Sequence, residues 1–354
     1  MAVYKIYPTK DATLYSAYPS MNTGDDAIIE VSNTNPAISP SPRVARSVID
    51  FNPSEINSII DNLIGSGSNY KSYLKLYVAE AQGISQDTTL ELRILTGSWN
   101  NGSGKYLDSP KSTNGVSWNW RLSSGSGAWD TPGGDISNTI TNVSQSFDRR
   151  TVKDFVVDAT NIIDTIYYDN VADYTDSLIL KLTGSQEFQS GSANQPIFKF
   201  FSIDTNTIYP PQLEFRWNDF TTSSDAPSEI STSDLQIALD SNPGIFYSES
   251  INRFRLNVRP EFPVRTFQTA SLYTTNFSLP TASYYAIKDL DTNEYVVDFD
   301  QDYTKISNDS NGSYFDIYMN GLEPERYYKI LVQTTVDGST LVKDEGYVFK
   351  VVNG

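Results

Sequence analysis

The stretch Arg253-Phe-Arg-Leu-Asn-Val-Arg259 alternates polar and apolar side chains at every step. In an extended strand this alternation places all the apolar side chains on one face. Similar short runs follow it at 283–289, 295–299, 314–319, 327–336 and 340–351. Asp337-Gly338, between the last two runs, is a strong signal for a two-residue hairpin turn. The C-terminal region is therefore predicted to consist of half-buried β-strands.

The N-terminal 217 residues show the same short strands separated by turn-rich loops, which is typical of a sandwich. The candidates lie at 27–31, 44–51, 73–79, 89–94, 155–158, 178–183, 197–203 and 212–217. Two helices are predicted between them, over 53–64 and over 160–167. The first has Asn52 as N-cap, Pro53 at its first position and Gly65 after its end.

These patterns predict an all-β chain with three parts. Residues 1–217 would form one β-sandwich with two short helices, and residues 251–354 a second. Residues 218–250 are rich in Ser, Thr, Asp and Asn and indicate a linker with one possible strand. The length of 354 residues suits two or three domains.

Composition excludes several classes of function. The chain has no Cys and no His, so disulfides, thiolate metal sites and Ser-His-Asp catalysis are excluded. A net charge of -17 disfavours nucleic acid and anionic membranes as partners. The cofactor expectation is none, with Ca²⁺ as the metal that oxygen ligands would select. The 23 Tyr residues favour strands and contact surfaces.

The N-terminal residues show no basic segment followed by an apolar one, and no run approaches the roughly 20 apolar residues of a membrane helix. We therefore expect a protein made in a cytosol, without a secretory signal, that leaves only inside a larger assembly.

Several motifs in residues 1–217 together resemble the DNRLRE-type jelly-roll domain, a carbohydrate-binding-module-like β-sandwich. The resemblance implies a jelly roll. Its motifs are Asp11-Ala-Thr-Leu-Tyr15, Pro19-x-x-Asn22-x-Gly24, Arg46-x-Val-Ile-Asp-Phe51, Trp99, Val116-Ser-Trp-Asn119, Phe155-Val-Val-Asp-Ala-Thr-Asn-Ile-Ile163 and Pro211-Gln-Leu-Glu-Phe215. The Ile-rich helix at 53–64 departs from the family, which has a shorter connection there.

Two further resemblances concern the C-terminal region and the whole chain. Gly321-Leu-Glu-Pro-Glu-Arg-Tyr-Tyr328 resembles the tyrosine corner of immunoglobulin- and fibronectin-type sandwiches. The run Val258-Arg-Pro-Glu-Phe-Pro-Val-Arg-Thr266 and the overall style resemble virion proteins of tailed bacteriophages, particularly of marine myophage type. This resemblance implies a place at the capsid surface, neck or tail.

Aromatic residues in the loops at 97–130 are the first candidate binding site: Trp99, Trp118, Trp120 and Trp129. Exposed indole faces can stack on the apolar face of a sugar, and Trp118 and Trp120 would share a face if both lay on a strand. The alternative is that these indoles fasten a long loop to the sandwich.

Two charged groups are the other candidates. Asp298, Asp300 and Asp302 would share one strand face and offer oxygen ligands for Ca²⁺, or they form a solvated acidic surface. Arg253, Arg255 and Arg259 line the polar face of the opening stretch. They would dock an acidic patch on a neighbouring subunit, or pair with carboxylates of their own chain.

The expected function is that of a non-enzymatic structural or decoration protein of a phage virion. Its partners would be other virion proteins and further copies of itself, with a surface polysaccharide as an additional partner. The alternative is a glycan-binding adhesion module that uses the Trp-rich loops. A glycan-cleaving enzyme would need a carboxylate pair, and no spacing singles one out.

Overall fold

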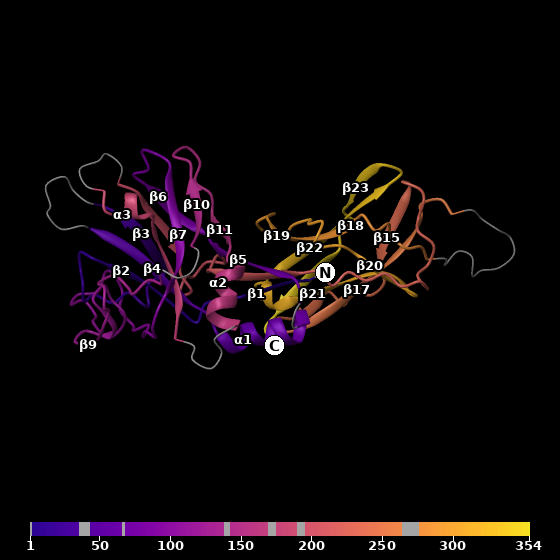
Figure 1. Cartoon of the computed structure of the whole chain (residues 1–354). Coiled ribbons are helices and arrows are strands. Elements are labelled where there is room, and N and C mark those ends of the chain that lie inside the picture. Colours follow the sequence, from indigo (N-terminus) through magenta and orange to yellow (C-terminus); the bar gives the residue numbers. More distant parts are fainter. Residues whose placement is uncertain are drawn as a thin grey trace. The chain divides into compact units, whose positions relative to one another are not determined.

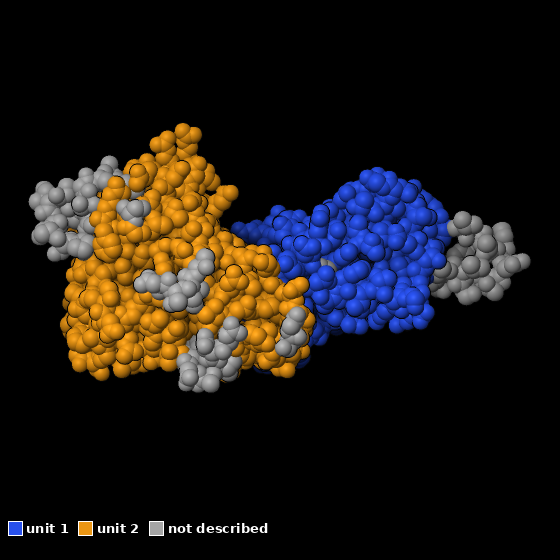
Figure 2. All heavy atoms as spheres, in the orientation of Figure 1, with its two compact units in different colours: residues 1–5, 215–354 blue, residues 6–214 orange. Residues whose placement is uncertain are grey.

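A computed structural model describes residues 2–34, 43–65, 68–137, 142–168, 175–189, 195–263 and 276–354, and it confirms the all-β class. The chain forms two compact units, residues 6–214 and residues 1–5 with 215–354 (Figure 2). The predicted linker segment, 218–250, contains strands β15 (Leu235–Leu239) and β16 (Ile245–Tyr247), both within the second unit.

The unit of residues 6–214 is built on two sheets (Figure 1). The larger sheet has the order β10-β7-β12-β4-β3-β13-β6, and β2 also pairs with β4. Its strands are β2 (Lys10–Tyr15), β3 (Ile28–Asn33), β4 (Val44–Asp50), β6 (Val78–Gln82), β7 (Thr88–Leu95), β10 (Val143–Phe147), β12 (Ser177–Leu182) and β13 (Ile197–Phe201).

The smaller sheet contributes β5 (Tyr70–Leu76) and β11 (Phe155–Asp158) to this unit, together with residues 212–214 of β14 (Gln212–Trp217). All of β1 (Ala2–Ile6) except Ile6 is counted in the other unit. Phe155 of β11 and Phe200 of β13 meet with ring centroids 6.5 Å apart. Aromatic contact between the inner faces of two sheets is the packing of a sandwich. A separate hairpin, β8 (Trp120–Ser123) with β9 (Ser126–Ala128), lies in the loop region.

The first predicted helix is present, with a change of geometry along its length. Helix α1 (Pro53–Ser58) starts where Asn52 Oδ1 accepts a hydrogen bond of 3.0 Å from the Ser54 amide. It continues as a π-helical segment, η1 (Ile59–Gly65), and the apolar spacing buries its isoleucines all the same: Ile56, Ile59, Ile60 and Ile64. Gly65 has φ +93°, which favours glycine at the end of a helix.

The second predicted helix is also present, as α2 (Thr160–Ile163) and the π-helical η2 (Asp164–Tyr168). Tyr167 is fully buried, and its hydroxyl lies 3.2 Å from Asp50 Oδ1. A third short helix, α3 (Gly184–Glu187), was not predicted.

Helix α3 places Glu187 in a buried cluster of charges. Arg46 of β4 makes two hydrogen bonds to Glu187, of 2.6 and 3.0 Å. Lys181 of β12 lies 3.1 Å from Glu187 and 2.9 Å from Glu91 of β7. All four side chains are at most 8% exposed. Removing one partner of such a cluster would leave an unpaired buried charge, so the cluster fixes α3 to the sheet.

The second unit also contains two sheets around one core. One has the order β15-β17-β21-β20 and the other β16-β24-β22-β18-β19, with β23 pairing β22. Besides β15 and β16, the strands are β17 (Ile251–Pro260), β18 (Ser283–Asp289), β19 (Tyr295–Val297), β20 (Ser307–Asp309), β21 (Gly312–Tyr318), β22 (Tyr327–Val336), β23 (Ser339–Lys343) and β24 (Val348–Val352). The opening stretch forms β17, and its apolar face, Phe254, Leu256 and Val258, is buried as predicted.

The predicted tyrosine corner is confirmed. Tyr328, near the start of β22, is 1% exposed, and its hydroxyl donates a hydrogen bond of 3.0 Å to the Glu323 carbonyl. Burial raises the pKa of this hydroxyl, which therefore stays protonated as the donor. The bond to a backbone oxygen five residues upstream fixes the chain where it enters the strand.

Candidate functional site

The tryptophans predicted to bind sugar are mostly buried. Trp99, Trp118 and Trp129 are between 3% and 9% exposed and belong to one hydrophobic core cluster. The indole N–H of Trp99 donates 2.7 Å to Ser177 Oγ, and that of Trp129 donates 2.9 Å to the Ser117 carbonyl. Of the four, only Trp120 is half-buried, and it begins strand β8. Trp118 lies outside this strand, so the predicted shared strand face of Trp118 and Trp120 is not found. These four indoles do not form an exposed stacking cluster, because three of them fill the core beneath the loops.

The loops at 97–130 are held by a residue that was not predicted as functional, Asn22. Its side chain is fully buried. Its Nδ2 donates to the carbonyls of Asn101 (2.6 Å) and Val116 (2.9 Å), and its Oδ1 accepts from the Gly104 amide (2.8 Å). A Cβ at Gly102 would lie 2.3 Å from Asn22 Oδ1, so the loop closes round this side chain. The motif Pro19-x-x-Asn22-x-Gly24 is the sequence signal for this anchor.

The acidic residues predicted to bind Ca²⁺ do not share a strand face. Asp298, Asp300 and Asp302 lie in the loop between β19 and β20. Asp300 Oδ1 accepts hydrogen bonds from the amides of Asp302 (2.8 Å) and Tyr303 (3.0 Å), as Asp does in a turn. Within the described ranges, no group of three acidic residues is placed to hold a metal ion. The carboxylates of Asp298 and Asp300 instead accept hydrogen bonds from local backbone amides, so the shared strand face expected for a calcium site is not found.

The arginine stripe is present on β17, and its guanidinium groups pair within the chain. Arg253 makes two hydrogen bonds to Asp316 (2.8 and 2.9 Å), and Arg255 makes two to Asp309 (2.9 and 2.7 Å). Both stack over Tyr314, at 4.1 and 5.4 Å from its ring centroid. Arg259 hydrogen-bonds to Gln236. Arg265, six residues further along the sequence, lies outside the described residues.

A groove in the unit of residues 6–214 was not predicted from the sequence. It has a volume of about 910 Å³, within the range of ligand-binding pockets. Its floor consists of alternate residues of β3 and β13, and three tyrosines stand at its side: Tyr15, Tyr18 and Tyr106. The sequence signal for this groove is the alternation of Ile28, Glu30 and Ser32 along β3. Tyr106 gives no such signal, because its position depends on how the loop folds.

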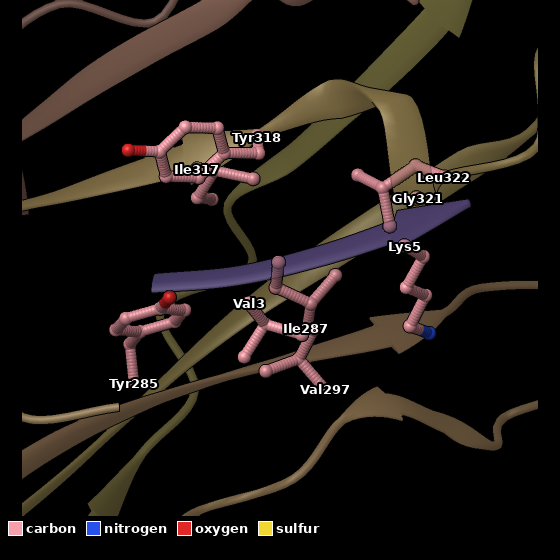
Figure 3. Close-up of a pocket in the computed structure, with 9 residues that line it drawn as sticks. All are labelled: Val3, Lys5, Tyr285, Ile287, Val297, Ile317, Tyr318, Gly321 and Leu322. Atoms are coloured by element: carbon pink, nitrogen blue, oxygen red, sulfur yellow. The ribbon is translucent and has the colours of Figure 1, made fainter. Parts of the chain in front are cut away.

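A second space lies beneath β1 in the other unit. Figure 3 shows Val3 on β1 facing Ile287 and Val297, with Lys5 further along the strand. Lys5 Nζ donates 3.0 Å to the Val296 carbonyl, and a Cβ at Gly321 would lie 3.0 Å from the Lys5 side chain. The volume is about 10 Å³, which is no more than the room for one water. This space is a packing gap under the N-terminal strand and holds no organic ligand.

Comparison with known proteins gives no family. No protein-family model matches the chain, and no curated protein does. Among solved structures, a β-glucuronidase from Parabacteroides merdae is 10% identical, with a TM-score of 0.23, over 98% of this chain and 35% of that chain. A DUF4785 family protein from Legionella pneumophila is 7% identical, with a TM-score of 0.18, over 100% of this chain and 62% of that chain.

The chain thus spans about a third of the glucuronidase and less than two thirds of the Legionella protein. At these TM-scores neither likeness carries an argument about this chain. Among the described residues, no helix is long and apolar enough to cross a membrane.

Proposed function

We propose that this chain is a non-enzymatic structural or decoration protein of a tailed-bacteriophage particle, placed at the capsid surface, neck or tail. Its β-sandwich surfaces would contact other virion proteins and further copies of the chain. The motif resemblances to such proteins are the starting point of the proposal.

One observation supports a structural role most directly. The three sequence features expected to carry chemistry are mostly engaged within the chain: three indoles fill a core, Asp298 and Asp300 cap local backbone, and two of the three arginines form ion pairs within the unit. Residues that stabilise loops and strands in this way build a rigid support for contacts.

A surface suited to such contacts lies on strand β16, at the edge of its sheet. Ile245 and Tyr247 are 58% and 63% exposed, whereas Phe246 between them packs against Phe254 with ring centroids 5.2 Å apart. In the strand register, Lys350 of β24 lies opposite Ile245 on one side and opposite Tyr327 of β22 on the other. Residues opposite one another point to the same side of a sheet, so Tyr327, 48% exposed, continues the face of Ile245. An exposed apolar edge strand is a ready template for another chain.

The proposal is tested by labelling purified phage particles with an antibody against this chain and viewing them by electron microscopy. Regular labelling at the head, neck or tail is the expected result. Absence of label from intact particles of a phage that encodes the chain would contradict the particle assignment.

The edge strand is tested in the same assay with Ile245→Lys/Tyr247→Lys. These outward side chains are not needed for the core, so we expect a folded chain that is lost from the particle. Val342→Lys, at a position 56% exposed on β23 of the same sheet, is the matched control and is expected to be incorporated normally. Normal incorporation of the double variant would show that β16 is not the contact.

A further inference from the structure

The groove in the unit of residues 6–214 has a floor made by one face of a sheet. β3 contributes Ile28, Glu30 and Ser32, and β13 contributes Ile197 and Lys199. Residues two apart on a strand point to the same side, so these polar and apolar groups form one continuous surface. β3 and β13 are paired, with Lys199 directly opposite Glu30.

Aromatic rings form the side of the groove. Tyr106 packs on Tyr15 and Tyr18, with ring centroids 5.0 and 6.1 Å apart. Tyr18 is 44% exposed and Tyr106 is 38% exposed. Unlike the buried indoles, these rings therefore present surface to a ligand. Leu107, 87% exposed, extends the apolar rim.

The rings are held in place before any ligand arrives. Asp26 accepts a hydrogen bond of 2.7 Å from the Tyr106 amide, and Lys105 lies 3.1 Å from Asp25. The Tyr15 hydroxyl donates to Glu30 (3.3 Å). Burial raises the pKa of Tyr15 and of Tyr106, so both hydroxyls remain protonated donors at neutral pH. A rigid site loses less conformational entropy on binding.

The charges of the groove balance one another, in a chain of net charge -17. Its lining has two acidic residues, Asp26 and Glu30, and two basic residues, Arg43 and Lys199. Lys199 also forms an ion pair of 2.6 Å with Glu80, and Glu30 accepts 2.6 Å from Ser32 Oγ. A site for a charged ligand would present a surplus of the opposite charge, and this lining presents none.

We propose that this groove binds a neutral oligosaccharide. A sugar ring has an apolar face that packs on tyrosine rings and a rim of hydroxyls that both donate and accept hydrogen bonds. The floor offers both partners for that rim, with a carboxylate acceptor at Glu30 and an ammonium donor at Lys199. The proposal does not rest on the particle assignment.

The test is a calorimetric titration of the full chain with neutral hexasaccharides of glucose, mannose, galactose and xylose at millimolar concentration. We expect at least one to bind. Tyr18→Ala is expected to weaken that binding about tenfold, since stacked aromatic contacts are worth this much, and Tyr18→Ala/Tyr106→Ala to abolish it. Because both side chains are more than a third exposed and lie outside the core, the variants should fold, which circular dichroism checks.

Tyr295→Ala is the matched control. Tyr295 is 43% exposed and carries Lys288 over its ring, as Tyr18 carries Lys111, but it belongs to the other unit. Its substitution should leave the affinity unchanged.

Three results would overturn the proposal: no neutral hexasaccharide binds, binding survives the double tyrosine substitution, or the groove takes only a charged glycan or a peptide. None of these results bears on particle labelling, so the two proposals fail separately.

Discussion

Two aromatic regions of the same unit differ in burial: three tryptophans of the loops at 97–130 are packed into the core, and the tyrosines of the groove are partly exposed. The loops at 97–130 bury three of their four tryptophans, and each of Trp99 and Trp129 satisfies its N–H with a buried oxygen. The groove leaves Tyr18 and Tyr106 more than a third exposed. Residue type alone does not distinguish a binding ring from a structural one. The partner of the polar atom and the exposure of the face decide it.

Truncating one ring from each region should affect the stability of the chain very differently. Trp99→Ala should lower the free energy of unfolding by about 4 kcal/mol, because it empties a packed core and leaves Ser177 Oγ without its donor. Tyr18→Ala should change it by no more than about 0.5 kcal/mol. Urea unfolding measures both. Equal losses would contradict the distinction between the two regions.

A buried carboxylate on β2, the strand that ends at Tyr15 of the groove, should make the stability of this unit depend on pH. Asp11 is 1% exposed, and burial raises its pKa to about 7, although its Oδ2 accepts 2.8 Å from the Ile203 amide. Because the folded pKa lies above the unfolded value, the native state binds the extra proton. Asp11 therefore lowers stability as pH rises from about 4 to 7, by roughly 3 kcal/mol in total.

Asp11→Asn should remove this slope and leave the variant the more stable protein at pH 8. The difference between wild type and variant, measured by urea unfolding from pH 4 to 8, isolates the effect. Asp302→Asn, at an exposed position, is the control and should follow the wild-type curve. A constant difference between Asp11→Asn and wild type across this range would show that Asp11 does not titrate there.

The anchor of the tryptophan loops gives a smaller effect. Asn22→Ala leaves the Asn101 and Val116 carbonyls and the Gly104 amide without their partner, and should cost about 2 kcal/mol. Limited proteolysis should then cut within 97–130. Asn100→Ala, exposed in the same loops, is the control and should resist the protease as wild type does. An Asn22 variant that is cut no faster than this control would exclude the anchoring role.

The exposed arginine pairs should matter least. Arg253 is 47% exposed, so Arg253→Ala should cost less than about 1 kcal/mol despite its two bonds to Asp316. Thermal unfolding at low and high salt checks this, with the small loss disappearing at high salt. A loss comparable to that of Trp99→Ala would mean that the stripe holds the sandwich.

Periodic patterns in the sequence predicted most of the fold. The alternation at 253–259 gave β17, and the spacing of isoleucines gave the first helix, although not its π-helical part, since both geometries bury the same residues. The tyrosine corner was visible because its hydrogen bond is local along the chain. Helix α3 was missed because it depends on Glu187 pairing with Arg46, 141 residues away.

The candidate site was much harder to predict. The groove joins residues from the ends of the unit's sequence, such as Tyr15 and Lys199, through strand pairing that no local pattern encodes. The tryptophans were predicted to bind sugar because exposed indole faces can stack on sugar rings. Their burial depends on the polar partners Ser177 and Ser117, which only the folded chain brings to them.

The most direct test of tyrosine rings that bind and indoles that do not is an NMR titration of the chain with its best neutral hexasaccharide, with tyrosine rings and tryptophan indoles isotopically labelled. The ring signals of Tyr18 and Tyr106 are expected to shift, while the indole N–H signals of Trp99 and Trp129 stay in place. Shifts in those indole signals with unmoved tyrosine rings would contradict this expectation, and would return the binding site to the loops at 97–130.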